Sequence, residues 1–158
     1  MDVDDHIYCL GLGTNIIPHQ NLHNAIESLR RYVKVEKVSS IWRTPSFGAV
    51  GPDFLNAAAL VRTHHPPDIL KEEILCYIEE ELGRVRSENK FAPRTIDIDI
   101  LVFDDQIIDE QIWYQPHLAL PIAELLPELT NPQNGETIEE AAIRLSKTVI
   151  NITRFDDT

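Results

Sequence analysis

Two aspartates with one residue between them interrupt an apolar stretch, Thr95-Ile-Asp-Ile-Asp-Ile-Leu101. Side chains two apart on a β-strand point to the same face, so Asp97 and Asp99 would project together while the isoleucines fill a core. Their Cβ atoms would lie roughly 6–7 Å apart, because a strand rises about 3.3 Å per residue. Carboxylates at that spacing repel each other, and two Mg²⁺ ions about 3.5–4 Å apart would neutralise both. A solvent-exposed face on which the aspartates pair with Arg or Lys explains the pattern equally well.

Basic side chains gather beside this segment, although the chain has a formal net charge of −12. Four of its 14 basic residues fall within eleven positions, namely Arg84, Arg86, Lys90 and Arg94. An arginine grips two phosphate oxygens with its planar fork and keeps its charge. The cluster favours a small anionic ligand such as a nucleotide phosphate, and a solvated basic loop is the simpler alternative. The polar segment 87–93 would then form a flexible lid over the nucleotide.

Other nucleotide and metal motifs are incomplete. The Walker A pattern is absent, and Gly11-Leu-Gly13 supplies only half of a dinucleotide fingerprint. His19 and His23 lie four apart on an expected helix but lack a third ligand nearby, which favours surface histidines. Cys9 and Cys76 lie far apart in apolar patterns and are expected to be reduced, buried thiols.

The elements that must position these side chains alternate between strand and helix patterns. Apolar and period-2 stretches predict strands at 6–13, 35–44, 54–63 and 95–103, and stripes of period 3.6 predict helices at 19–33 and 66–82. After loop and short extended pieces at 104–120, we expect a short helix at 121–126 and a last helix that opens on the capping box Thr137-Ile-Glu-Glu140. The order predicts the α+β class, with a ferredoxin-like βαββαβ antiparallel sheet and flanking helices in one domain over 1–158.

Composition limits location and partners. The 158 residues, 43% of them hydrophobic, suit one domain with a real core. No apolar run approaches the ~20 residues that span a bilayer, and the first residues lack the basic start and apolar stretch of a signal peptide. The negative net charge argues against nucleic acids and membrane surfaces. We therefore expect a cytoplasmic monomer whose partners are small molecules, with no nucleic-acid or membrane partner.

The motifs together resemble the 6-hydroxymethyl-7,8-dihydropterin pyrophosphokinase family, whose members transfer diphosphate from ATP to a pterin alcohol in folate synthesis. The pairing of Pro-Arg-Thr-x-Asp-x-Asp-x with Gly-Arg-x-Arg is specific for it. The matching stretches run in the family's order over about the first 130 residues and are Leu12-Gly-Thr-Asn15, Ser40-Ile-Trp-Arg-Thr-Pro45, Pro52-Asp-Phe-Leu-Asn-Ala-Ala58, Gly83-Arg-Val-Arg86, Ala92-Pro-Arg-Thr-Ile-Asp-Ile-Asp-Ile-Leu101 and Pro116-His117.

The resemblance implies ATP as co-substrate and a role for each matching residue. Asp97 and Asp99 would hold two Mg²⁺ ions, and together with Arg84 and Arg94 they would be catalytic. The implied ATP contacts are Glu79, Arg84, Arg86, Phe91, Arg94, Ile100 and His117. The implied pterin contacts are Thr44, Pro45, Phe47, Phe54, Asn56 and Asp97. Phe54 can stack on a flat bicyclic ring, and Asn56 offers a donor and an acceptor to its amide-like edge.

The chain departs from the family pattern near its histidine. Family members usually carry a longer stretch after the Pro-His step, which supplies an arginine for ATP and a second aromatic for the pterin. Here Pro116-His117 runs directly into Leu118-Ala-Leu-Pro121, and a position that is often basic is Ile112. Trp113 and Tyr114 are candidates to replace the missing ring. An active pterin enzyme, a related diphosphotransferase for another heterocyclic alcohol and a non-catalytic nucleotide-binding module are therefore all considered.

Overall fold

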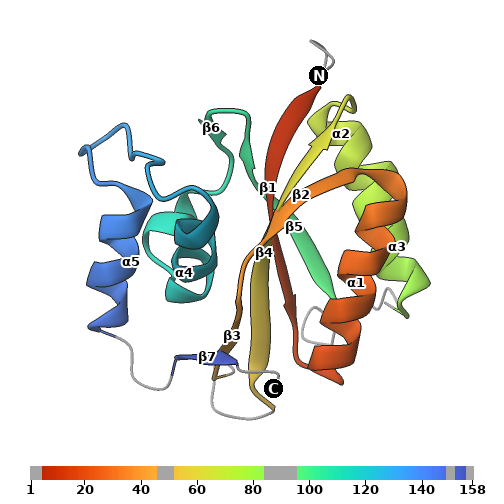
Figure 1. Cartoon of the computed structure of the whole chain (residues 1–158), viewed down its shortest axis with the longest axis horizontal. Helices are drawn as coiled ribbons and strands as arrows, with labels where there is room; N and C mark the ends of the chain where they lie inside the picture. The colour runs from red at the N-terminus through yellow and green to blue at the C-terminus, as the bar shows by residue number, and fades with distance from the viewer. Residues whose placement is uncertain (1–4, 46–51, 84–95, 149–151, 156–158) are drawn as a thin grey trace, which may run out of the picture.

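A computed structural model of the chain describes residues 5–45, 52–83, 96–148 and 152–155. Its centre is an antiparallel β-sheet with helices on both faces (Figure 1). The strands are β1 (His6–Thr14), β2 (Lys34–Val38), β3 (Ile41–Thr44), β4 (Phe54–Thr63), β5 (Asp97–Phe103), β6 (Gln106–Ile107) and β7 (Thr153–Phe155). Their order in the sheet is β6-β5-β1-β4-β3-β7, and β2 also pairs with β4.

The helices form two layers (Figure 1). One face of the sheet carries α1 (Pro18–Tyr32) and a continuous helical segment made of α2 (Pro67–Ile69), the π-helical η1 (Leu70–Leu75) and α3 (Cys76–Glu81). The other face carries α4 (Pro116–Leu125) and α5 (Ile138–Ser146), and the 3-10 helix η2 (Glu110–Trp113) precedes α4. No helix in these described ranges is both long and apolar enough to cross a membrane.

This arrangement confirms the predicted ferredoxin-like α+β fold. The strand predicted at 54–63 has those bounds, and the predicted helix at 19–33 lies within one residue of α1. The capping box at Thr137 is also present, since its side chain accepts from the backbone N–H of Glu140. The single strand predicted at 35–44 is instead two strands. Ser39 breaks it, because its Oγ accepts the Ala58 N–H at 2.8 Å and holds the chain between β2 and β3.

The segment after His117 is more helical than predicted. Residues 104–120 were expected to be loop and short extended pieces, but α4 starts at Pro116 rather than at Pro121. Pro116 occupies the first turn, where a proline loses no intrahelical hydrogen bond. Pro121 lies inside the helix and is buried. This early start places His117 and Leu118 on the first turn of a helix that packs against the sheet.

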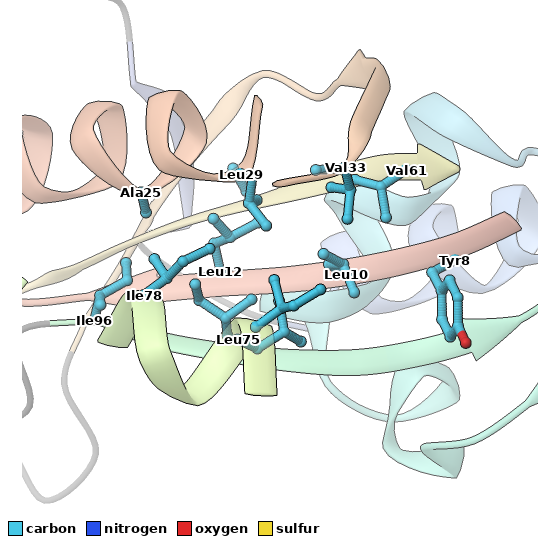
Figure 2. Packing of buried hydrophobic residues seen from close by; sticks show 14 of the residues in the cluster. Tyr8, Leu10, Leu12, Ala25, Leu29, Val33, Val61, Leu75, Ile78 and Ile96 are labelled. Atoms are coloured by element: carbon cyan, nitrogen blue, oxygen red, sulfur yellow. The ribbon is translucent and has the colours of Figure 1, made fainter. Parts of the chain in front are cut away.

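Each face of the sheet has its own hydrophobic core. The first core lies between the sheet and the α1 and η1–α3 helices, and Figure 2 shows Leu10 and Leu12 of β1 packing there with Leu29 and Leu75. The second core joins Cys9 and Leu101 to Ile122 of α4 and Ile138 of α5. Successive residues of β1 therefore serve opposite cores, which fixes the orientation of the strand.

Candidate functional site

A cavity of about 390 Å³ lies between the sheet and the η2–α4 segment. Six of the predicted site residues line the cavity from the side of the sheet, namely Thr44, Pro45, Phe54, Asn56, Asp97 and Asp99. The opposite side consists of Asp109, Gln111, Gln115, His117, Leu118 and Pro121, which we call the helical wall. The fold thus brings the predicted acceptor residues, the carboxylate pair and the histidine into one cavity.

The two aspartates share a face of β5, as their spacing predicts. Both line the cavity, whereas Ile96 and Ile98 are fully buried in the first core. Asp97 pairs in register with Gly13 of β1, and Asp99 pairs with Gly11. The carboxylates therefore stand beside a part of β1 that has no side chains on the cavity face, since Leu12 between the glycines packs in the first core.

The glycines leave the floor of the cavity open. A Cβ atom at Gly11 would lie 2.8 Å from Cδ1 of Leu101, and one at Gly13 would lie 3.0 Å from Oδ1 of Asn56. The approach at Gly11 is closer than real Cβ atoms come and that at Gly13 is tighter than most, so a side chain would require Leu101 or Asn56 to shift. The floor at Gly11 and Gly13 is accordingly main chain.

Asn56 is held in one orientation. It is only 6% exposed, and its Nδ2 donates to Oγ1 of Thr44 at 2.9 Å. The carboxamide oxygen then lies over Gly13 as an acceptor. Phe54, two residues earlier on the same strand, is half-buried and lines the cavity. A flat ring with donor groups on one edge would find an aromatic surface and a fixed acceptor here.

Asp99 forms an ion pair at the side of the cavity. Nζ of Lys71 lies 3.2 Å from its Oδ1, with side-chain exposures of 37% and 52%. The two explanations of the Asp-x-Asp pattern are therefore compatible, since a partly exposed pair with lysine exists beside an open cavity. Among the described residues, no cluster of three or more His, Cys, Asp or Glu side chains is arranged to hold a metal. Two carboxylates alone suit Mg²⁺, which takes its other ligands from phosphates and water.

His117 stands on the first turn of α4, where it is half-buried. Burial lowers the pKa of the imidazole below its ordinary value of 6.5, and the nearby Asp109 carboxylate opposes this effect. The ring is therefore neutral at neutral pH and can both donate and accept a hydrogen bond. Asp109 itself caps η2, because its Oδ1 accepts the Gln111 N–H at 2.9 Å.

Two predicted ATP contacts lie on the other side of β5. Glu79 is 1% exposed, and its Oε2 accepts the Ile98 N–H at 3.0 Å. Ile100 packs against the first core. Neither side chain lines the cavity. The remaining predicted site residues, Phe47, Arg84, Arg86, Phe91 and Arg94, lie outside the described residues.

The two candidates to replace the missing aromatic, Trp113 and Tyr114, do not line the cavity, because Trp113 is 3% exposed in the second core and Tyr114 is 59% exposed elsewhere on the surface. Ile112, at the position that is often basic in the family, is fully buried in the second core. Leu118 and Pro121 line the cavity instead. Asp109, Gln111 and Gln115 were missed from the sequence. No local signal marked them, because Ile112, Trp113 and Tyr114 interrupt the polar residues before Pro116.

A family model described as 7,8-dihydro-6-hydroxymethylpterin-pyrophosphokinase (HPPK) matches residues 9–127. The chain is 35% identical over 145 residues to the 2-amino-4-hydroxy-6-hydroxymethyldihydropteridine pyrophosphokinase of Synechocystis sp., covering 84% of this chain and 73% of the relative. It is 37% identical over 148 residues to the protein of the same name from Methylorubrum extorquens, covering 86% and 91%.

The fold is similar to that of Plasmodium falciparum HPPK-DHPS, with a TM-score of 0.75 at 15% sequence identity. That match covers 95% of this chain and 48% of the Plasmodium chain, so this chain spans about half of the solved protein. At this identity the likeness concerns the fold.

Proposed function

Because this chain belongs to the 7,8-dihydro-6-hydroxymethylpterin-pyrophosphokinase family, we propose that it transfers a diphosphate from ATP to the hydroxymethyl group of 6-hydroxymethyl-7,8-dihydropterin. The products are AMP and the pterin diphosphate, a step of folate biosynthesis. The observation that carries the proposal is the single cavity in which Asp97 and Asp99 meet Phe54 and Asn56.

The chemistry follows from the products. Since AMP is released, the hydroxymethyl oxygen forms a bond to the β-phosphorus, and the bond from that phosphorus to the bridging oxygen of the α-phosphate breaks. The hydroxyl proton leaves the acceptor oxygen as the new bond forms and passes to water. Such a transfer depends on alignment of the two oxygens and on neutralisation of phosphate charge rather than on covalent catalysis.

The acceptor ring would lie between the sheet and the helical wall. Phe54 would stack on one of its faces, while Leu118 and Pro121 supply an apolar surface from α4. The oxygen of Asn56, oriented by Thr44, would accept from the amide-like edge of the pterin. A cavity of about 390 Å³ is at the small end of ligand sites, which suits one bicyclic ring.

The carboxylate pair fits two Mg²⁺ ions, because hard oxygen ligands on one face of a strand leave room for phosphate oxygens. Bound Mg²⁺ would supply charge neutralisation to the triphosphate. His117 would donate a hydrogen bond to a phosphate oxygen. Arg84 and Arg94 would bind phosphates, with Arg86, Phe91, Glu79 and Ile100 as further ATP contacts and Phe47 as a pterin contact, as the family motifs imply.

A related diphosphotransferase for another heterocyclic alcohol is a second candidate. The observation in its favour is the helical wall, because aliphatic Leu118 and Pro121 line the cavity directly after the Pro116-His117 step, where the family's longer stretch with its second aromatic is missing. An aliphatic surface discriminates less sharply between flat rings than a second stacking face.

The test is the formation of AMP from ATP and 6-hydroxymethyl-7,8-dihydropterin in the presence of Mg²⁺. We expect turnover by the wild type, and a loss of roughly 10²–10³-fold or more in kcat for Asp97→Ala and Asp99→Ala. Both variants should fold, since each substitution also relieves repulsion between the two carboxylates. The matched control is Asp105→Ala, which removes an exposed carboxylate outside the cavity.

Near-normal turnover by either cavity variant would exclude the carboxylate mechanism. AMP formation with a different heterocyclic alcohol, but not with the pterin, would support the second candidate. Calorimetry that shows ATP binding without AMP formation from any acceptor would indicate a non-catalytic nucleotide-binding module.

A further inference from the structure

Two side chains hold the outer edge of β5 between the two aspartates. β6 pairs with β5 at Val102 and Phe103, beyond this point. At Ile98 the main-chain N–H donates to Oε2 of Glu79 at 3.0 Å, and the carbonyl accepts from Nζ of Lys71 at 2.7 Å. The residue that separates Asp97 from Asp99 thus has both of its main-chain polar groups bound by the η1–α3 helical segment.

Lys71 connects this edge to the cavity. Its ammonium group, which binds the Ile98 carbonyl, is also 3.2 Å from Oδ1 of Asp99. Lys71 belongs to η1 on the first-core face of the sheet, whereas Asp99 lines the cavity on the other face. The lysine side chain therefore reaches around the strand edge, and its carbonyl contact fixes where the positive charge stands.

The pair with Asp99 is suited to exchange. Both side chains are partly exposed, so solvent screens their attraction and a stronger cation can compete for the carboxylate. The contact to the Ile98 carbonyl does not depend on Asp99, which gives the ammonium a partner when the carboxylate turns to another ligand. The interaction that positions Lys71 therefore survives the loss of the ion pair.

We propose that Lys71 is a positioning residue that neutralises and orients Asp99 before a divalent cation binds and then yields this carboxylate to the cation. The inference rests on the proposed function only in taking Asp97 and Asp99 as cation ligands. Because a positive charge beside Asp99 opposes the arrival of another, Lys71 weakens binding of a divalent cation alone. Loss of the lysine charge should therefore tighten such binding by roughly 3–10-fold.

The experiment titrates the whole protein with Mg²⁺ in calorimetry, without ATP or pterin. Lys71→Met keeps an unbranched apolar stem and removes the charge, and we expect its Mg²⁺ affinity to exceed that of the wild type. Lys71→Arg keeps the charge and should resemble the wild type. Lys37→Met removes an exposed lysine of β2 and is the matched control. Adding Asp99→Asn to Lys71→Met should abolish the gain.

A measurement on the wild type covers the case in which Lys71→Met does not fold. The ammonium resonance of Lys71 should move towards that of exposed lysines when Mg²⁺ saturates the site. A resonance that stays in place, a Lys71→Met affinity equal to or below the wild type, or no Mg²⁺ binding by either protein would each overturn the inference. AMP formation by a wild type that shows any of these results would leave the proposed function standing while this inference fails.

Discussion

At the residue scale, His117 combines burial with a neighbouring carboxylate. The apolar surroundings favour the neutral imidazole, and Asp109 favours the charged one, with burial the stronger effect on the pKa. A neutral ring can donate a hydrogen bond to a phosphate without adding a fixed positive charge. The cations that neutralise the nucleotide would then come from bound metal and from arginines.

The lowered pKa of His117 predicts a pH-dependent stability. Protonation of a group whose pKa is lower in the folded state favours unfolding, so its contribution is fully present above 6.5 and is lost as pH falls below that value. The free energy of unfolding of the wild type should therefore fall more between about pH 7.5 and 5.5 than that of His117→Gln. Urea unfolding at several pH values measures the difference.

The control for this experiment is His23→Gln, because His23 is an exposed residue of α1. It should keep the wild-type pH dependence. Equal slopes for the wild type and His117→Gln would contradict the predicted effect of burial.

Sequence spacing located the carboxylates but not every polar residue of the cavity. Asp97 and Asp99 were predictable because strand periodicity alone decides which face they share. Asp109, Gln111 and Gln115 occupy a cap, a 3-10 turn and a helix entrance. The direction of such side chains depends on how α4 docks on the sheet, which no local pattern encodes.

At the element scale, α4 is tied to the sheet near the cavity. Oε2 of Glu124 accepts from Nε1 of Trp42 at 2.8 Å, and its Oε1 accepts from the Ser40 N–H at 3.2 Å. These contacts join the last part of the helix to β3, which also carries Thr44. The helical wall is therefore fixed relative to the strand that orients Asn56.

Removal of this link should loosen the wall. We expect Glu124→Ala to lower the free energy of unfolding by about 0.5–1.5 kcal/mol, because two donors lose a partner at a partly exposed site. The KM for the acceptor alcohol should rise, while the KM for ATP changes little. Glu128→Ala, at an exposed position after α4, is the control. An unchanged acceptor KM would show that α4 is positioned by its core contacts alone.

The wall itself can be tested at Leu118. Leu118→Ala should raise the KM for the acceptor by about 3–10-fold, because it removes apolar contact with the ring. Each buried methylene contributes ~0.8 kcal/mol to binding. Leu120→Ala is matched in size and helix but lies outside the cavity lining, so it should alter stability without altering that KM. Steady-state kinetics with varied acceptor separates the two, and equal effects would argue against a contact between Leu118 and the ring.

The elements themselves were predicted unevenly. The bounds of β4 and α1 follow from clear apolar periods, and the α5 start follows from its capping box. The sequence placed a helix start at Pro121, because a proline fits the first turn of a helix better than its interior. In the structure Pro121 lies inside α4. The three-residue β7 has too few positions to show a period.

At the scale of the whole molecule, one sheet separates two cores. β1 sends Leu10 to the first core and Cys9 to the second, so neither core can lose its packing without disturbing the strand they share. Because β1 also supplies Gly11 and Gly13 to the floor of the cavity, loss of packing in either core should also disrupt the cavity.

A variant with a truncated side chain in either core should therefore be less stable, and it should still unfold in one cooperative transition. Leu29→Ala and Ile122→Ala, each at a fully buried position, should lower the free energy of unfolding by about 2–5 kcal/mol. Tryptophan fluorescence and far-UV circular dichroism should report one coincident transition in urea. Ile143→Ala, at a position that is 52% exposed, should change stability by less than about 0.5 kcal/mol. Separate transitions for the two variants would show that the cores unfold independently.

The main-chain floor at Gly11 and Gly13 restricts how such a protein could acquire a new acceptor. Peptide groups present the same surface whatever the residue, and any larger residue there would displace Leu101 or Asn56. Substitutions at these two glycines would therefore change ligand choice indirectly, whereas substitutions at Phe54, at Asn56 and in the segment 109–121 would change the cavity lining itself. A directed-evolution library aimed at other heterocyclic alcohols should vary that segment and leave β1 untouched.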